Sequence, residues 1–189
     1  ISGEGFIAVQ GKGGKEGYTR AGNLQLDKGN LVTKSGEIVL GRSGLINIPK
    51  QPGTYPIIVM LRGFAEKETY FTSQGTQRAG EYFAQNGYIT LAPDFLGYGE
   101  SDNPSDLAIE ERFQTYVTVL TLLKSIKNLD SSLITHHLSL RVDPDRLGIW
   151  AHSNGGQIAL SVLEITGASY PTVLWAPVSK PFPYSNLYY

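Results

Sequence analysis

The sequence predicts an α/β fold: a doubly wound, mostly parallel sheet with helices on both faces. Short, continuous apolar runs recur along the chain, and such runs are typical of strands that are buried on both faces. Segments with helical periodicity stand between these runs. The alternation of strands and helices favours parallel pairing through right-handed crossovers.

The sheet is expected to use four apolar runs, at 57–61, 88–92, 147–151 and within 170–179. A turn that contains Pro144 is expected to lead into the third of these runs. Three helices are expected, over 72–87 with Gly87 at its end, over 106–129, and over 154–167. The helix over 106–129 has an apolar stripe with steps of three and four residues. The stripe consists of Phe113, Tyr116, Val117, Leu120, Leu123 and Ile126.

The chain ahead of this core is different in composition. Residues 1–30 are rich in glycine, and residues 31–50 alternate as β structure with a turn at Ser35-Gly36, so antiparallel hairpins are expected here. The glycine spacing fits neither a Walker loop nor a dinucleotide-binding loop, which weakens a nucleotide-binding interpretation. We expect three parts: residues 1–30 as a β/loop segment, 31–180 as the α/β core, and 181–189 as the start of a cap segment.

Composition excludes several classes of function. A formal net charge of −1 gives no electrostatic case for binding nucleic acid, and no run approaches the roughly 20 apolar residues of a membrane span. The absence of cysteine excludes disulfides, thiolate metal sites and a cysteine nucleophile. No histidines have the spacing of metal ligands, so neither a metal nor a cofactor is expected. The compartment is left open.

A serine lies at the junction of the third strand and the third helix, in the stretch AHSNG (151–155). In the G-x-S-x-G pattern, a serine nucleophile occupies a sharp strand-to-helix turn, and its neighbours two positions away are small. Gly156 adds another small residue. Ser153 is therefore the candidate nucleophile, and a serine that only caps the helix is the alternative. The backbone N–H groups of Asn154 and Phe64 are the candidate oxyanion donors, since Phe64 follows the strand 57–61.

These motifs together resemble the α/β-hydrolase superfamily, most closely its prolyl-oligopeptidase and dienelactone-hydrolase-like branch. The similar stretches are GLINIPK (44–50), IIVMLRGF (57–64), LAPDFLGYGESD (91–102), VDPDRLGIWAHSNGG (142–156) and TVLWAPVS (172–179). The resemblance implies that Ser153 is the nucleophile and that Phe64 and Asn154 form the oxyanion hole. Arg62 stands where the family often has histidine, and Ala151 stands where it has glycine.

The acid and base of a catalytic triad are harder to place. In this family they follow the serine, first Asp or Glu and then His. After Ser153 the chain has only Glu164 and no histidine. Glu164 belongs to the following helix, too far along it to meet a base beside the serine. His136 and His137 are expected at the surface, and His152 is expected to pack below the site.

The resemblance therefore implies that the chain corresponds to the amino-terminal part of a hydrolase. A C-terminal remainder, continuous with this chain or a separate polypeptide, would supply the acid and base. The expected function is a serine hydrolase that cleaves small peptides or carboxylic esters through an acyl-enzyme on Ser153 and that is inactive as the isolated chain. The alternative is a non-catalytic binding module on a hydrolase scaffold.

Overall fold

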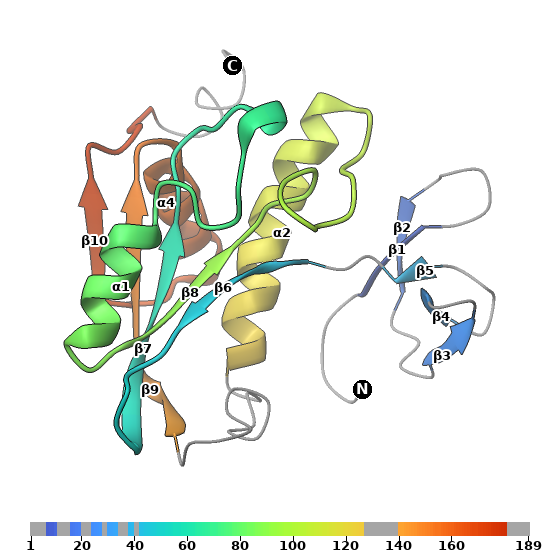
Figure 1. Cartoon of the computed structure of the whole chain (residues 1–189). Helices are drawn as coiled ribbons and strands as arrows, with labels where there is room; N and C mark the ends of the chain where they lie inside the picture. The colour runs from blue at the N-terminus through green and yellow to red at the C-terminus, as the bar shows by residue number, and fades with distance from the viewer. Residues whose placement is uncertain are drawn as a thin grey trace. The chain divides into compact units, whose positions relative to one another are not determined.

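A computed structural model describes residues 42–126 and 140–180 and, ahead of them, five strands between residues 7 and 39. The chain forms two compact units, Ile1–Arg42 and Ser43–Tyr189 (Figure 1). The division between the two units falls after Arg42. From the glycine-rich composition, the first boundary is expected after residue 30. The expected cap segment (181–189) lies outside the described residues.

The first unit is a five-stranded antiparallel sheet. Its strands are β1 (Ile7–Gln10), β2 (Glu16–Thr19), β3 (Leu24–Asp27), β4 (Asn30–Thr33) and β5 (Ile38–Val39). Their order in the sheet is β2-β1-β5-β4-β3, and every neighbouring pair is antiparallel. The antiparallel hairpins expected near the N-terminus are therefore present as β1–β2 and β3–β4.

The second unit is a mixed sheet with helices on both faces. Its strands are β6 (Gly44–Asn47), β7 (Gly53–Leu61), β8 (Ile89–Pro93), β9 (Leu140–His152) and β10 (Thr172–Trp175). Its helices are η1 (Lys67–Thr69), α1 (Gln77–Gln85), α2 (Ala108–Ile126) and α4 (Asn154–Thr166). The sheet order is β10-β9-β7-β8-β6, and only the β6–β8 pair is antiparallel. This confirms the predicted fold class.

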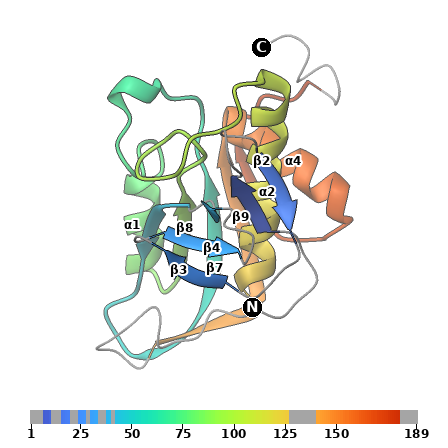
Figure 2. The ribbon, with the colours of Figure 1, turned by 90° about the vertical axis from the view of Figure 1, so that its right-hand side faces the viewer.

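The alternation of side chains along β7 and β9 decides which helix covers which face. Ile57, Val59 and Leu61 pack with Ile149 and Ala151 in the larger core, beneath α2 and α4. The residues between them, Met60 and Trp150, pack with Phe83 of α1 on the opposite face. Figure 2 shows α1 on one side of the sheet and α2 with α4 on the other. Burial on both faces explains why the runs 57–61 of β7 and 147–151 of β9 lack charged and polar side chains.

The segment before Ser153 departs from the expected turn. The run 143–146 was expected to form a turn that leads into a strand at Leu147, but β9 begins at Leu140 and carries this run as a bulge opposite Pro56 and Ile57. Within the bulge, Arg146 Nε donates to Asp143 Oδ2 at 2.6 Å, and this hydrogen bond lowers the pKa of Asp143. Proline is accepted because a bulge leaves its residue outside the ladder.

Two helix predictions were also wrong in detail. The helix expected over 72–87 is limited to α1, because Gly75 has a φ of 83° and the chain enters the helix only at Thr76. In α2, Phe113 belongs to the predicted apolar stripe but is 48% exposed, and it contacts the Tyr116 ring edge-on. The buried side of α2 instead includes Tyr116, Val119 and Leu123. No helix in the described ranges is long and apolar enough to cross a membrane.

Candidate active site

Ser153 forms the turn between β9 and α4, at the carboxyl end of the parallel strands (Figure 1). Its φ of 52° and ψ of −117° are rare for a residue with a side chain. Its N–H donates to the Trp175 carbonyl at 3.1 Å, and its carbonyl accepts from the N–H groups of Gly156 and Val178, both at 2.9 Å. Such strain persists only where the surrounding structure fixes it, and it concentrates at functional sites.

Two glycines after the serine allow α4 to approach its neighbours. A Cβ on Gly155 would overlap the carbonyl oxygen of Leu61 and lie 2.6 Å from that of Arg62. A Cβ on Gly156 would lie 2.5 Å from Pro177 Cβ. Backbone carbonyls of a central strand cannot move aside cheaply. The sequence pattern of small residues after Ser153 therefore has a direct steric cause.

The loop after β7 lies against this turn. A Cβ on Gly63 would be 3.1 Å from Ser153 Cβ and 3.2 Å from His152 Nδ1, so the loop backbone reaches the serine. Phe64 follows it and is 72% exposed. Asn154 is the first residue of α4, where a backbone N–H has no partner within the helix. The structure thus brings Ser153, Phe64 and Asn154 together at one end of the sheet.

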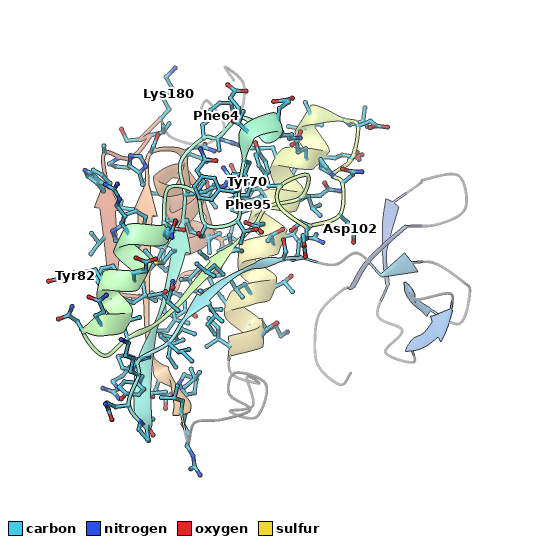
Figure 3. All side chains as sticks on the ribbon, in the orientation of Figure 1. Phe64, Tyr70, Tyr82, Phe95, Asp102 and Lys180 are labelled. Carbon is cyan, nitrogen blue, oxygen red and sulfur yellow. The ribbon has the colours of Figure 1, made fainter. Side chains whose placement is uncertain are left out.

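A cavity of about 610 Å³ opens at Ser153. Its size is within the range of small-molecule sites, roughly 300–1,000 Å³. Figure 3 shows Phe64 and Phe95 at this end of the unit. The apolar side chains that line the cavity are Phe64, Phe95, Leu96, Ile109, Ile158 and Val178. Three charged residues also line the cavity: Arg62, Glu111 and Arg112.

Arg112 links α2 to the start of α4. Its Nη2 donates to Asn154 Oδ1 at 3.1 Å and to Gln157 Oε1 at 2.9 Å. Gln157 is buried, and its Nε2 donates to the hydroxyl oxygens of Tyr116 (2.8 Å) and Ser161 (2.9 Å). These bonds fix the first turn of α4, which carries the Asn154 N–H. Sequence reasoning missed Arg112, because its partners lie more than forty residues away.

A buried carboxylate lies beneath the loops around the cavity. Asp94 is fully buried after β8 and accepts three hydroxyl hydrogen bonds: from Tyr70 at 2.5 Å, and from Ser43 and Thr72 at 2.7 Å each. Burial, and then the hydrogen bond to Asp94, raise the pKa of Tyr70 to about 12. A Cβ on Gly99, which has a φ of 58°, would overlap the Asp94 carboxylate. Asp94 lies in the stretch LAPDFLGYG (91–99), but no role for it was expected from the sequence.

The structure brings no acid–base pair to Ser153 among the residues it describes. His152 is the one histidine in those ranges, and its ring packs on Trp175 with a centroid distance of 4.6 Å. Glu164 is exposed on α4. His136 and His137 lie outside the described residues. Within the described ranges, no three His, Cys, Asp or Glu side chains form a group that could hold a metal.

Comparison with known proteins separates the two ends of the chain. The chain is similar to the α/β hydrolase GrgF from Penicillium sp. sh18, with a TM-score of 0.54 and 20% sequence identity over 79% of this chain and 45% of that one. It is also 29% identical, over 139 residues, to the uncharacterized peptidase YtmA of Bacillus subtilis (strain 168), which covers 72% of this chain and 46% of that protein. The chain thus spans less than half the length of these proteins, and its fold is that of the α/β hydrolases.

The N-terminal end matches a different family. Residues 1–63 match the model of the flagellar hook protein FlgE/F/G D1 domain. A stretch of 47 residues is 43% identical to the flagellar basal-body rod protein FlgF of Escherichia coli (strain K12), covering 25% of this chain and 19% of that protein. The family match includes the first unit and continues into β6 and β7.

Proposed function

We propose that the second unit is a serine hydrolase that cleaves a carboxylic ester or peptide bond through an acyl-enzyme on Ser153. The observation that carries this proposal is the strained backbone of Ser153, a residue with a side chain at a φ of 52°, at the mouth of a cavity of about 610 Å³. The turn has the strand-to-helix form of a nucleophile elbow, which exposes the serine hydroxyl at the top of the sheet.

In the proposed reaction, Ser153 Oγ bonds to the substrate carbonyl carbon and gives up its proton to a base. The carbonyl oxygen becomes an oxyanion, to which the N–H groups of Phe64 and Asn154 would donate. Each such donor is worth about 3 kcal/mol of transition-state stabilisation. Collapse of the tetrahedral intermediate releases the alcohol or amine, and water then hydrolyses the acyl-serine.

We further propose that the acid and base come from a segment outside residues 1–189, either a continuation of the chain or a separate polypeptide. The packing of His152 on Trp175 and the exposure of Glu164 support this. The edge of the sheet offers a place for such a segment, because Val173 and Trp175 of β10 are 59% and 60% exposed. An apolar edge strand of this kind is a pairing site for a further strand.

The resemblance to the prolyl-oligopeptidase branch bears on the choice between peptide and ester substrates. The Asp-Pro-Asp-Arg run (143–146) ahead of the serine, together with the 29% identity to a peptidase, supports the prolyl-oligopeptidase-like branch and a small peptide substrate. A carboxylic ester is the second substrate class. The aromatic and aliphatic lining of the cavity suits an apolar acyl group in either case.

A fluorophosphonate probe tests the proposal, because it forms a P–O bond with an activated serine and releases fluoride. In the complete protein, which includes the segment that supplies the base, we expect one phosphonyl group on the wild type and none on Ser153→Ala. Ser179→Ala is the matched control, because Ser179 is an exposed serine next to the cavity-lining Val178, and it should label like the wild type. Equal labelling of the Ser153→Ala variant would refute the assignment.

A second candidate function is supported by the match of residues 1–63 to a flagellar D1 domain. In this alternative, the first unit is an assembly module of the flagellar rod type, and the hydrolase-like unit is a non-catalytic binding module. Labelling discriminates between the two candidates. A folded complete protein that binds to rod proteins but never labels at Ser153 would favour the second.

A further inference from the structure

Arg62 stands out among the buried polar side chains. It follows the last residue of β7 and is only 5% exposed. Its Nη1 donates to the carbonyl of Gly63 at 2.8 Å, whereas Nε and Nη2 are buried without a hydrogen-bond partner. Three aromatic rings surround its guanidinium carbon: Tyr98 at 4.0 Å, Tyr70 at 4.7 Å and Phe95 at 5.3 Å from the ring centroids.

The bond to Gly63 fixes the direction of the next N–H group. The peptide that joins Gly63 to Phe64 is planar and trans, so its C=O and its N–H point in opposite directions. Arg62 holds the C=O on the side of the aromatic rings. The Phe64 N–H is therefore turned the other way. Because the Gly63 backbone lies against Ser153, a small rotation of this peptide would change what the N–H can reach.

The surroundings of Arg62 are themselves held in place. The Tyr98 hydroxyl donates to the Ala65 carbonyl at 3.1 Å, so the ring that stacks on Arg62 also fixes the loop two residues further on. The Tyr70 hydroxyl donates to Asp94, and its raised pKa of about 12 keeps it a neutral donor. The ring of Tyr70 therefore presents a neutral π face to the guanidinium.

This arrangement is costly as a purely structural device. In the described chain, Arg62 forms neither of the two salt bridges, which join Lys67 to Glu111 and Arg146 to Asp143. Burying a charge without a direct ion pair is costly, and cation–π contacts and the hydrogen bond to Gly63 offset part of that cost here. An apolar side chain of similar volume would avoid that cost but would leave the Gly63 carbonyl free to rotate.

We infer that Arg62 is a positioning residue: its bond to the Gly63 carbonyl orients the Phe64 N–H toward the oxyanion that forms at Ser153. The inference rests on the proposed function of Ser153. Loss of this orientation should slow the covalent step and leave ground-state binding in the cavity unchanged, since the oxyanion exists only in the transition state.

The test compares Arg62→Met and Arg62→Lys with the wild type, each in the complete protein that includes the base, by the kinetics of fluorophosphonate labelling. The rate constant of labelling is measured at increasing probe concentrations. Its plateau gives the maximal labelling rate, and the concentration at half of the plateau reports the affinity of the probe. We expect Arg62→Met to reduce the maximal rate by about 10²-fold, the effect of losing one oxyanion donor, with unchanged affinity. Arg62→Lys keeps a donor and a charge and should recover part of the rate. The control is Arg78→Met, which removes an exposed arginine from α1, on the opposite face of the sheet from α4, and this variant should label like the wild type.

The outcomes are distinguishable. If the wild type labels at Ser153 and Arg62→Met labels at the same maximal rate, the role of Arg62 is overturned and the proposed function stands. If the wild type fails to label, the proposed function fails, and this inference fails with it. If Arg62→Met does not fold, the Arg62→Lys variant tests the inference instead. A folded lysine variant with a wild-type maximal rate overturns the inference, and one with a reduced rate and unchanged affinity supports it.

Discussion

The chain of residues 1–189, expressed alone, is expected to hydrolyse a p-nitrophenyl ester only about 10³–10⁴-fold faster than water does. That is the residual catalysis that an oxyanion hole and substrate binding provide when triad members are removed. Complete enzymes reach accelerations of about 10⁶ to 10¹⁷. The physical reason is the absence of a base beside Ser153 in the part of the chain that the structure describes, where the ring of His152 packs on Trp175. The measurement is kcat/KM on a preparation shown to be folded and monomeric.

The pH dependence of this residual rate makes the test sharper. Without a histidine base, the rate should rise with pH as hydroxide takes the serine proton, with no plateau near neutrality. With a histidine base, it should level off above the imidazole pKa of about 6.5. A full rate with such a plateau would show that the base lies within the chain, and His136, His137 and His152 would then be the candidates.

Replacement of Gly155 by alanine is expected to destabilise the second unit by about 3 kcal/mol or more, and replacement by valine to prevent its folding. The added Cβ would overlap the Leu61 carbonyl oxygen and lie 2.6 Å from that of Arg62, both in the backbone at the end of β7. Overpacking of this kind typically costs 1–3 kcal/mol and more where backbone must move. Thermal unfolding should show a decrease in Tm of about 10 °C for the alanine variant.

Gly148→Ala is the matched control for this effect. Gly148 lies in β9, and a Cβ there would come no closer than 3.2 Å to another atom, the carbonyl oxygen of Pro171. Its stability should stay within about 1 kcal/mol of the wild type. A Gly155→Ala variant as stable as Gly148→Ala would mean that α4 does not approach β7 as closely as the structure has it.

The fold class could be predicted from the sequence because its signals are local. The runs 57–61, 88–92 and 147–151 are largely apolar, and the structure packs them between α1 on one face and α2 with α4 on the other. The turn at Ser153 was equally visible, since a serine followed by Gly155 and Gly156 at a strand–helix junction has a steric cause that acts within a few residues.

Features that depend on distant partners could not be predicted. The bulge at 143–146 is set by its pairing with Pro56 and Ile57, so the sequence around Pro144 alone suggested a turn. The exposure of Phe113 depends on where α2 meets the sheet, which its periodicity does not specify. The environment of Arg62 combines rings from two other segments, Tyr70 from one and Phe95 with Tyr98 from the other, so no local pattern predicts it.

The N-terminal end shows another limit of local reasoning. Glycine-rich composition predicted turns and antiparallel hairpins, which are present in β1–β2 and β3–β4. It did not predict the likeness of residues 1–63 to a flagellar D1 domain, because such a likeness resides in a pattern of individual positions rather than in glycine content or periodicity.

The most direct test of the central claim is to locate the phosphonyl group on the chain after reaction with a fluorophosphonate. Fragmentation of the tryptic peptide that begins at Leu147 distinguishes Ser153 from the other serines of that peptide. The account predicts one phosphonyl group, on Ser153, because among the serines of the described ranges it alone combines the strained turn with an open cavity. A single adduct on another residue, with Ser153 unmodified in a folded chain, would contradict it.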